Sequence, residues 1–94
     1  MYQKAFEIEL GLRQIPFNRE YPVNITYKNQ PVGKVRLDFV IADRVVVELK
    51  AIEQYAPIHT AKTVSYLKAT GFKVGLLLNF NAPVLKDGIK RVIN

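Results

Sequence analysis

The sequence predicts one α/β domain over residues 1–94, with a central mixed sheet flanked by helices and elements in the order α-β-β-β-α-β. Three observations lead to this fold class. Two segments repeat apolar residues at steps of three and four, as amphipathic helices do. Three segments alternate apolar and polar residues, as half-buried strands do. One further segment is almost entirely apolar, which is typical of a central strand covered on both faces.

The first element is a helix over Tyr2–Arg13, where apolar residues recur at helical spacing. It ends at Ile15, because a residue that precedes proline disfavours the helical conformation. No capping residue precedes the helix, so we expect it to begin abruptly at the start of the given sequence.

Three strands are expected next, over Tyr21–Lys28, Val32–Ala42 and Arg44–Lys50. The residues Lys28 to Pro31 have the chemistry of a turn between the first two strands. Strict alternation in the second strand predicts one apolar face, made of Val35, Leu37, Phe39 and Ile41. The opposite face would then carry Lys34, Arg36, Asp38 and Val40.

A second helix is expected over Pro57–Thr70, since proline suits a first helical turn and Gly71 suits the position just after the last. The segment Lys73–Phe80 is the apolar central strand. The segment Gly88–Asn94 could form one more short strand at the edge of the sheet.

Composition narrows the functional classes. The chain has no cysteine, which excludes disulfides, a thiolate nucleophile and a cysteine zinc site. No apolar run reaches the roughly 18 residues of a membrane span, and no secretion signal is recognisable, so we expect a cytoplasmic protein without a membrane partner. The formal net charge of +6 suits a nucleic-acid partner, although a merely solvated basic surface would give the same value.

The chemistry-bearing residues lie on the hairpin of the second and third strands. If the hairpin is symmetric about Asp43, then Asp38 faces Glu48 and Arg36 faces Lys50. Residues directly opposite each other have Cβ atoms about 4.5–5.5 Å apart. The hairpin would therefore present two carboxylates and two cations on one face.

Two opposed carboxylates under a helix repel each other, and two arrangements relieve the repulsion. One carboxylate retains a proton, or a divalent cation lies between them, and oxygen ligands favour Mg²⁺ or Mn²⁺. Lys50 could then orient or deprotonate a water, or stabilise charge on a phosphate. The alternative is a ladder of cross-strand salt bridges on a solvated sheet face.

The pattern Asp38-x9-Glu48-x-Lys50 resembles the PD-(D/E)XK nuclease superfamily, and more closely its GxxExxY branch. The segments that carry the resemblance, in order, are VELKA, YLKATG and GLLLNF. The resemblance implies a restriction-endonuclease-like fold and a nuclease that hydrolyses phosphodiester bonds of DNA or RNA. It also implies Asp38 and Glu48 as ligands of Mg²⁺ or Mn²⁺, and Lys50 as the catalytic lysine.

The sequence departs from this family at two places. Tyr2 resembles the tyrosine of the Gly-x-x-Glu-x-x-Tyr motif, so the motif glutamate would precede Met1, and we expect impaired activity. Lys62 stands where relatives commonly have a glutamine, four residues before Tyr66. We expect Arg36, Lys62 and Tyr66 to contact phosphate. His59 is either a structural residue or a supporting residue behind the site.

Two other functions remain open from the sequence alone. The chain could be a non-catalytic nucleic-acid-binding domain that kept the fold, with salt-sensitive and metal-independent binding. It could also be a protein-interaction module, in the form of a homodimer that covers apolar sheet surface.

Overall fold

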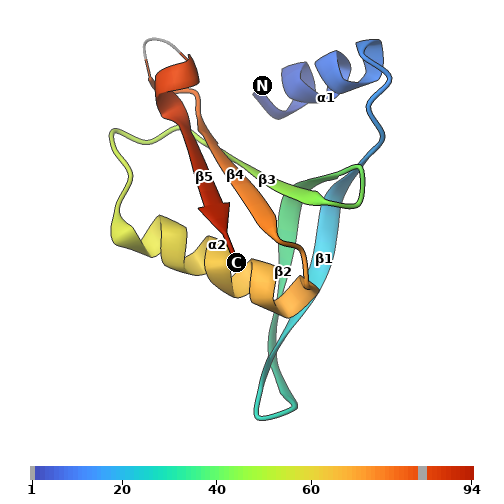
Figure 1. The fold of residues 1–94 in the computed structure, drawn as a ribbon, viewed down its shortest axis with the longest axis vertical. Coiled ribbons are helices and arrows are strands. Elements are labelled where there is room, and N and C mark those ends of the chain that lie inside the picture. The colour runs from blue at the N-terminus through green and yellow to red at the C-terminus, as the bar shows by residue number, and fades with distance from the viewer. Residues whose placement is uncertain (1, 83–84) are drawn as a thin grey trace.

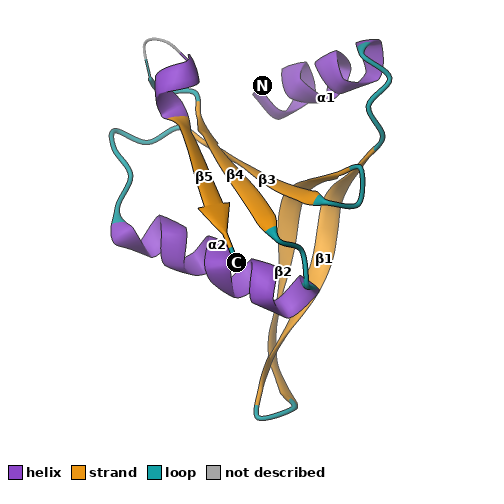
Figure 2. Cartoon of the chain, in the orientation of Figure 1, coloured by secondary structure: helices purple, strands orange, loops and turns teal. Residues whose placement is uncertain are grey.

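A computed structural model describes residues 2–82 and 85–94, and its elements follow the predicted order (Figure 1, Figure 2). The helices are α1 (Tyr2–Leu12), α2 (Pro57–Thr70) and the short 3₁₀ turn η1 (Leu85–Gly88). The strands are β1 (Phe17–Tyr27), β2 (Gln30–Ile41), β3 (Val45–Lys50), β4 (Val74–Asn79) and β5 (Ile89–Ile93).

The strands form one mixed sheet in the order β1-β2-β3-β4-β5. Strands β3 and β4 are parallel and are connected through α2, whereas the other neighbouring pairs are antiparallel. The two helices cover opposite faces: Val46 packs in a cluster with Leu67 of α2, and the adjacent Val47 packs with Leu10 of α1. The predicted α/β fold with a sheet between helices is confirmed.

Helix α2 has the bounds that its sequence predicts. Pro57 lies in the first turn, and Gly71 ends the helix with a φ of 85°. The Gly71 N–H donates to the carbonyl of Leu67 at 2.8 Å, which satisfies a carbonyl at the helix end. None of the described helices is long and apolar enough to cross a membrane.

The first strand begins earlier than predicted, at Phe17 instead of Tyr21. Its opening residues pair with the end of β2, where Phe17 lies opposite Ile41 and Arg19 opposite Phe39. Glu20 has a φ of 53°, which interrupts the extended backbone between this part and the rest of the strand. Because of this irregularity, the alternation of apolar and polar residues in the sequence does not show where the strand begins.

The predicted single apolar face of β2 is wrong. Phe39 and Ile41 pack on the α1 side of the sheet, but Leu37 and Val35 pack on the α2 side. The change of side falls at Asp38, which lies between the register pairs Arg19–Phe39 and Tyr21–Leu37, as does the irregular Glu20 of β1. Strict alternation assumes an evenly extended strand, and this assumption fails at that point.

The β2–β3 hairpin has the predicted register from Ile41–Val45 to Phe39–Val47. The ladder ends there, so the expected pairing of Arg36 with Lys50 does not form. Beyond Phe39, strand β2 continues only with β1 as a long two-stranded ribbon that leaves the body of the sheet (Figure 1).

Candidate functional site

The predicted carboxylates lie at the fork where β2 and β3 separate. Asp38 and Glu48 occupy the position directly after the last ladder pair. The Asp38 N–H donates to Glu48 Oε2 at 3.4 Å, and the Leu49 N–H donates to Asp38 Oδ2 at 2.7 Å. The two side chains thus take over hydrogen bonds that main-chain carbonyls make elsewhere in the sheet.

Glu48 is buried on the α2 side of the sheet, with 7% of its surface exposed. Burial is the main cause that raises the pKa of Glu48 to about 8, and the hydrogen bond and negative charge of Asp38 contribute to this rise. The backbone of Asp38 and the charge of Lys50 oppose this rise. A buried carboxyl next to a second carboxylate favours a proton or a bound cation.

Lys50 follows Glu48 on the same face of β3, because alternate residues of a strand share a face. Its side chain is half-buried, and its positive charge acts on the Glu48 carboxyl. Asp38, Glu48 and Lys50 are therefore brought together at one fork. The site occupies the carboxyl end of β3, which is parallel to β4.

The segment after Lys50 is fixed by a side chain that the sequence reasoning missed. Asn79 is buried at the end of β4, with 5% of its surface exposed. Its Oδ1 accepts the N–H groups of Ile52 and Asn81, each at 3.1 Å, and its Nδ2 donates to the Ile52 carbonyl at 2.9 Å. The Phe80 N–H also donates to the Lys50 carbonyl at 2.8 Å. The sequence does carry one signal for this residue, because Asn79 is a single amide at the end of an otherwise apolar strand.

Tyr66 extends the site from helix α2. Its side chain is half-buried, and burial raises the pKa of the Tyr66 phenol. The negative charge of Glu48 adds to this rise, so the two side chains are near each other. Lys62 lies one helical turn earlier and is exposed, in a position to meet a ligand that approaches α2 from solvent.

The remaining two predicted site residues lie apart from the carboxylates. His59 accepts the Ala56 N–H through Nδ1 at 2.8 Å, which satisfies a free donor at the start of α2. Its ring also contacts Tyr55 edge-on, with centroids 6.1 Å apart. Arg36 is exposed, and because its neighbours Val35 and Leu37 face α2, Arg36 points to the opposite face.

The donor chemistry of the fork fits a hard divalent cation. Asp38 and Glu48 offer carboxylate oxygens, the ligand type that Mg²⁺ and Mn²⁺ prefer. The salt bridges in the described part of the chain, Arg13–Glu9 and Arg19–Glu7, are both on the surface, and neither includes a fork carboxylate. Within residues 2–82 and 85–94, no group of three His, Asp or Glu side chains could hold a metal. Two protein ligands are thus available there, and water or substrate would complete the shell.

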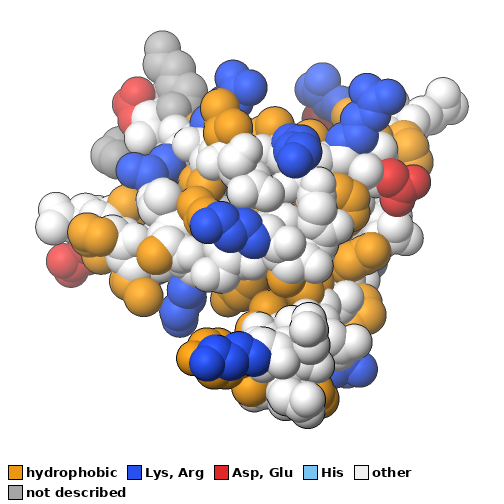
Figure 3. Space-filling model, turned by 60° about the horizontal axis from the view of Figure 1, so that its bottom comes forward, with side chains coloured by type: hydrophobic (Ala, Val, Ile, Leu, Met, Phe, Trp, Pro, Cys, Tyr) orange, Lys and Arg blue, Asp and Glu red, His pale blue; other side chains and the backbone are white. Residues whose placement is uncertain are grey.

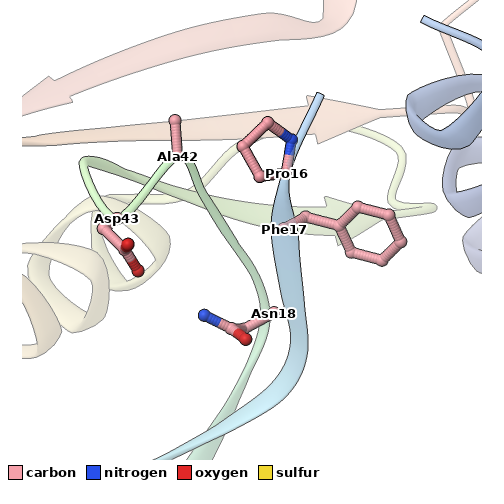
Figure 4. A pocket seen from close by; sticks show the side chains of 5 residues that line it. All are labelled: Pro16, Phe17, Asn18, Ala42 and Asp43. Carbon is pink, nitrogen blue, oxygen red and sulfur yellow. The ribbon is translucent and has the colours of Figure 1, made fainter. Parts of the chain in front are cut away.

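A small surface cavity lies elsewhere on the molecule. It has a volume of about 210 Å³ and is lined by Pro16, Phe17, Asn18, Ala42 and Asp43. Figure 4 shows the side chains of Asn18 and Asp43 near each other, whereas the Phe17 ring points away from them. The cavity borders the β2–β3 turn and shares no residue with the carboxylate fork. It does not contribute to the site.

The sheet has a helix on each face, and an Asp, a Glu and a Lys lie at the fork of two of its strands, which is the arrangement that the sequence predicts. The family model of the PD-(D/E)XK nuclease superfamily matches residues 1–92, and the chain belongs to this superfamily. No curated protein matches the sequence significantly.

The fold also resembles a solved structure. The crystal structure of an alkaline exonuclease from Laribacter hongkongensis superposes with a TM-score of 0.57 at 13% sequence identity. The match covers 97% of this chain and 53% of the exonuclease, so the chain spans about half the length of that protein. At this identity the likeness concerns the fold.

Proposed function

We propose that this chain is a metal-dependent nuclease domain that hydrolyses phosphodiester bonds of nucleic acid. The observation that carries the proposal is the meeting of Asp38, Glu48 and Lys50 at one sheet fork. Membership of the PD-(D/E)XK nuclease superfamily supports a nucleic-acid substrate.

Asp38 and Glu48 would hold Mg²⁺ or Mn²⁺ between β2 and β3. A bound ion of this kind acts as a Lewis acid on a phosphate oxygen and lowers the pKa of a bound water. Glu48 must release its retained proton for this, so binding of the ion is coupled to proton loss at the Glu48 carboxyl.

Lys50 would place a positive charge where negative charge develops on the phosphate, or would orient the attacking water. The loop that Asn79 fixes keeps the main chain of Lys50 in place during this step. Tyr66 and Lys62 on α2 are the proposed phosphate contacts beside the fork. His59 would support the site by fixing the start of that helix.

The proposal predicts cleavage that needs both metal and Asp38. Purified protein with Mg²⁺ or Mn²⁺ is expected to nick supercoiled plasmid or to shorten labelled DNA or RNA strands. Asp38→Asn removes a charged ligand but keeps the shape, and we expect activity to fall by about 10²-fold or more. The rate of product formation, measured over a series of metal concentrations, provides the test.

The matched control is Asp43→Asn, which makes the same chemical change at the exposed turn of the same hairpin. It should leave the rate unchanged. If the wild-type protein cuts none of these substrates with either metal, or if Asp38→Asn cuts as fast as the Asp43→Asn control, the nuclease assignment fails.

A second candidate function is nucleic-acid binding without cleavage. It is favoured because the fork offers few metal ligands: among the described residues, no third acidic or histidine side chain joins Asp38 and Glu48. This function predicts binding that falls steeply with salt and that is unaffected by chelation of metal.

The family branch, the oligomeric state and the location of the protein are proposed as well. The VELKA, YLKATG and GLLLNF segments support placement in the GxxExxY branch. A homodimer is proposed because apolar side chains such as Ile89 and Ile93 are exposed on β5. The expected cytoplasmic location stays a prediction.

A further inference from the structure

The β1–β2 ribbon continues past the point where β3 separates from β2, and the apolar side chains at its end, Tyr27 and Val32, are exposed. We define its outer part, residues 22–36, as the arm. Strand β3 leaves β2 at Phe39, so the arm consists of two strands only. It forms the narrow lower end of the molecule along the longest axis of 41 Å (Figure 1).

The arm has a well-defined end. Tyr27 pairs with Gln30, which leaves a two-residue turn of Lys28 and Asn29. Both turn residues have positive φ values, 50° and 65°, as in the tight turns that match the twist of a hairpin. The Lys28 Nζ lies 5.5 Å from the centroid of the exposed Tyr27 ring. The end of the arm is therefore a compact, cationic tip with an aromatic side chain.

The two faces of the arm differ in chemistry. Val23, Ile25 and Val35 face α2 and pack against the core cluster on that side. The outer face carries Lys34 opposite Asn24 and Arg36 opposite Pro22, and all four side chains are exposed. The outer face is thus polar and basic in the part nearest the fork.

The arm has no negative charge of its own. Residues 22–36 contain three cationic side chains, Lys28, Lys34 and Arg36, and no aspartate or glutamate. In Figure 3 the lobe that comes forward at the bottom of the view carries blue but no red side chains. Solvated strand faces commonly carry both signs, so a one-signed stripe points to a polyanionic partner.

The dimensions of the arm fit a DNA duplex. Gln30 lies eight residues from Asp38, about 26 Å along an extended strand, or roughly eight base pairs of duplex. The major groove of B-form DNA admits a two-stranded β-ribbon, whereas that of A-form RNA is too narrow and deep for side chains to read. The arm begins at the carboxylate fork, so a duplex held on its outer face would start beside the fork, on the face of the sheet opposite Glu48.

We propose that the arm binds B-form double-stranded DNA beside the proposed cleavage site, through contacts of Lys28, Lys34 and Arg36 with phosphate groups. This inference deepens the proposed function and rests on it for the choice of nucleic acid as partner. It also gives Arg36, which points away from the carboxylates, a phosphate contact of its own. Tyr27 and Lys28 would meet the duplex at its far end.

The test is binding without cleavage, measured by fluorescence anisotropy in EDTA over a range of salt concentrations. The probes are a DNA duplex, an RNA duplex and a DNA single strand of one sequence. The triple variant Lys28→Gln, Lys34→Gln, Arg36→Gln is expected to lower the slope of log affinity against log salt on duplex DNA by about 2 to 3, because each lost phosphate contact removes about 0.9. Its affinity should fall by roughly tenfold or more at low salt.

The matched control is Lys4→Gln, Arg13→Gln, Arg44→Gln, which removes three exposed cations elsewhere and also lowers the formal net charge from +6 by three. Circular dichroism checks that both triple variants fold. If the arm variant does not fold, the single variants Lys34→Gln and Arg36→Gln carry the test, each with an expected slope change of about 0.9.

Three results would overturn the assignment: equal losses in the arm and control variants, no loss in the arm variant, or an equal dependence on the arm for the RNA duplex or the single strand. Because these measurements need neither metal nor turnover, they are independent of the cleavage assay. A protein that binds through the arm but never cuts would refute the nuclease proposal only. A protein that cuts but ignores the arm would refute this inference only.

Discussion

Glu48 has the most unusual environment of any charged residue at the site. A glutamate on an exposed strand face is hydrated, but this one is buried under α2 beside the Asp38 carboxyl. Burial and Asp38 together raise its pKa to about 8. The residue is thus poised to exchange a proton for a cation, which is the property that a metal ligand at a buried fork requires.

The raised pKa of Glu48 predicts how the stability of the metal-free protein depends on pH. The folded state keeps a proton that the unfolded chain releases near pH 4.5, so the free energy of unfolding decreases as the pH rises from about 4.5 to about 8. The stabilisation that comes from the retained proton on Glu48 is complete below this pH window and is lost above it. Its slope is at most about 1.4 kcal/mol per pH unit for one proton.

Urea unfolding in EDTA between pH 5 and 9 measures this slope. Glu48→Gln, which mimics the protonated acid, should flatten the dependence, whereas Glu53→Gln at an exposed position should not change it. An identical pH dependence in Glu48→Gln and wild type would contradict the prediction.

At the scale of elements, helix α2 sets the geometry of the site because it lies close to the sheet. Gly75 of β4 permits this approach: a Cβ built there would lie 2.9 Å from Thr63 Cγ2 and 3.7 Å from the methyl groups of Leu67. Thr63 is itself buried, and its hydroxyl donates to the His59 carbonyl at 2.9 Å. A β-branched side chain held in this way has little freedom to move aside.

Gly75→Ala is therefore expected to destabilise the protein, by about 1–3 kcal/mol, through overpacking between α2 and β4. Gly11→Ala is the matched control, because no atom lies within 4 Å of a Cβ at that helical position. The control should stabilise the protein by up to about 1 kcal/mol. Chemical denaturation distinguishes the two, and equal stability of both variants would show that the α2–β4 contact is looser than described.

At the scale of the whole molecule, four elements meet at the fork: the β2–β3 hairpin, helix α2 and the end of β4. β2 and β3 supply the carboxylates, α2 supplies Tyr66, and the end of β4 fixes the loop beyond Lys50. Ligand binding at such a point should stabilise the entire fold, since a ligand that binds only the folded state shifts the unfolding equilibrium.

Mg²⁺ or Mn²⁺ is accordingly expected to raise the thermal midpoint of the wild-type protein. At ten times the dissociation constant the stabilisation is about 1.4 kcal/mol, which corresponds to several degrees in a domain of this size. Asp38→Asn should abolish most of the increase, whereas Asp43→Asn should keep it. A midpoint that either ion leaves unchanged at millimolar concentration would argue against metal binding at the fork.

The sequence by itself determined the order of the elements, the bounds of α2, and the hairpin register that makes Asp38 and Glu48 neighbours. These features follow from local chemistry: apolar periodicity, Pro57 and Gly71 at the helix ends, and a short turn between two alternating segments.

Only the tertiary structure decided where the ladder ends, which way Arg36 points, and which groups surround Glu48. The irregularity at Glu20 moves part of β2 to the other face, and it lies in a different strand from Asp38. The positions of Tyr66 and Asn79 depend on how α2 and β4 pack against β3. Such contacts join residues far apart in the chain, and local sequence patterns carry no information on their geometry.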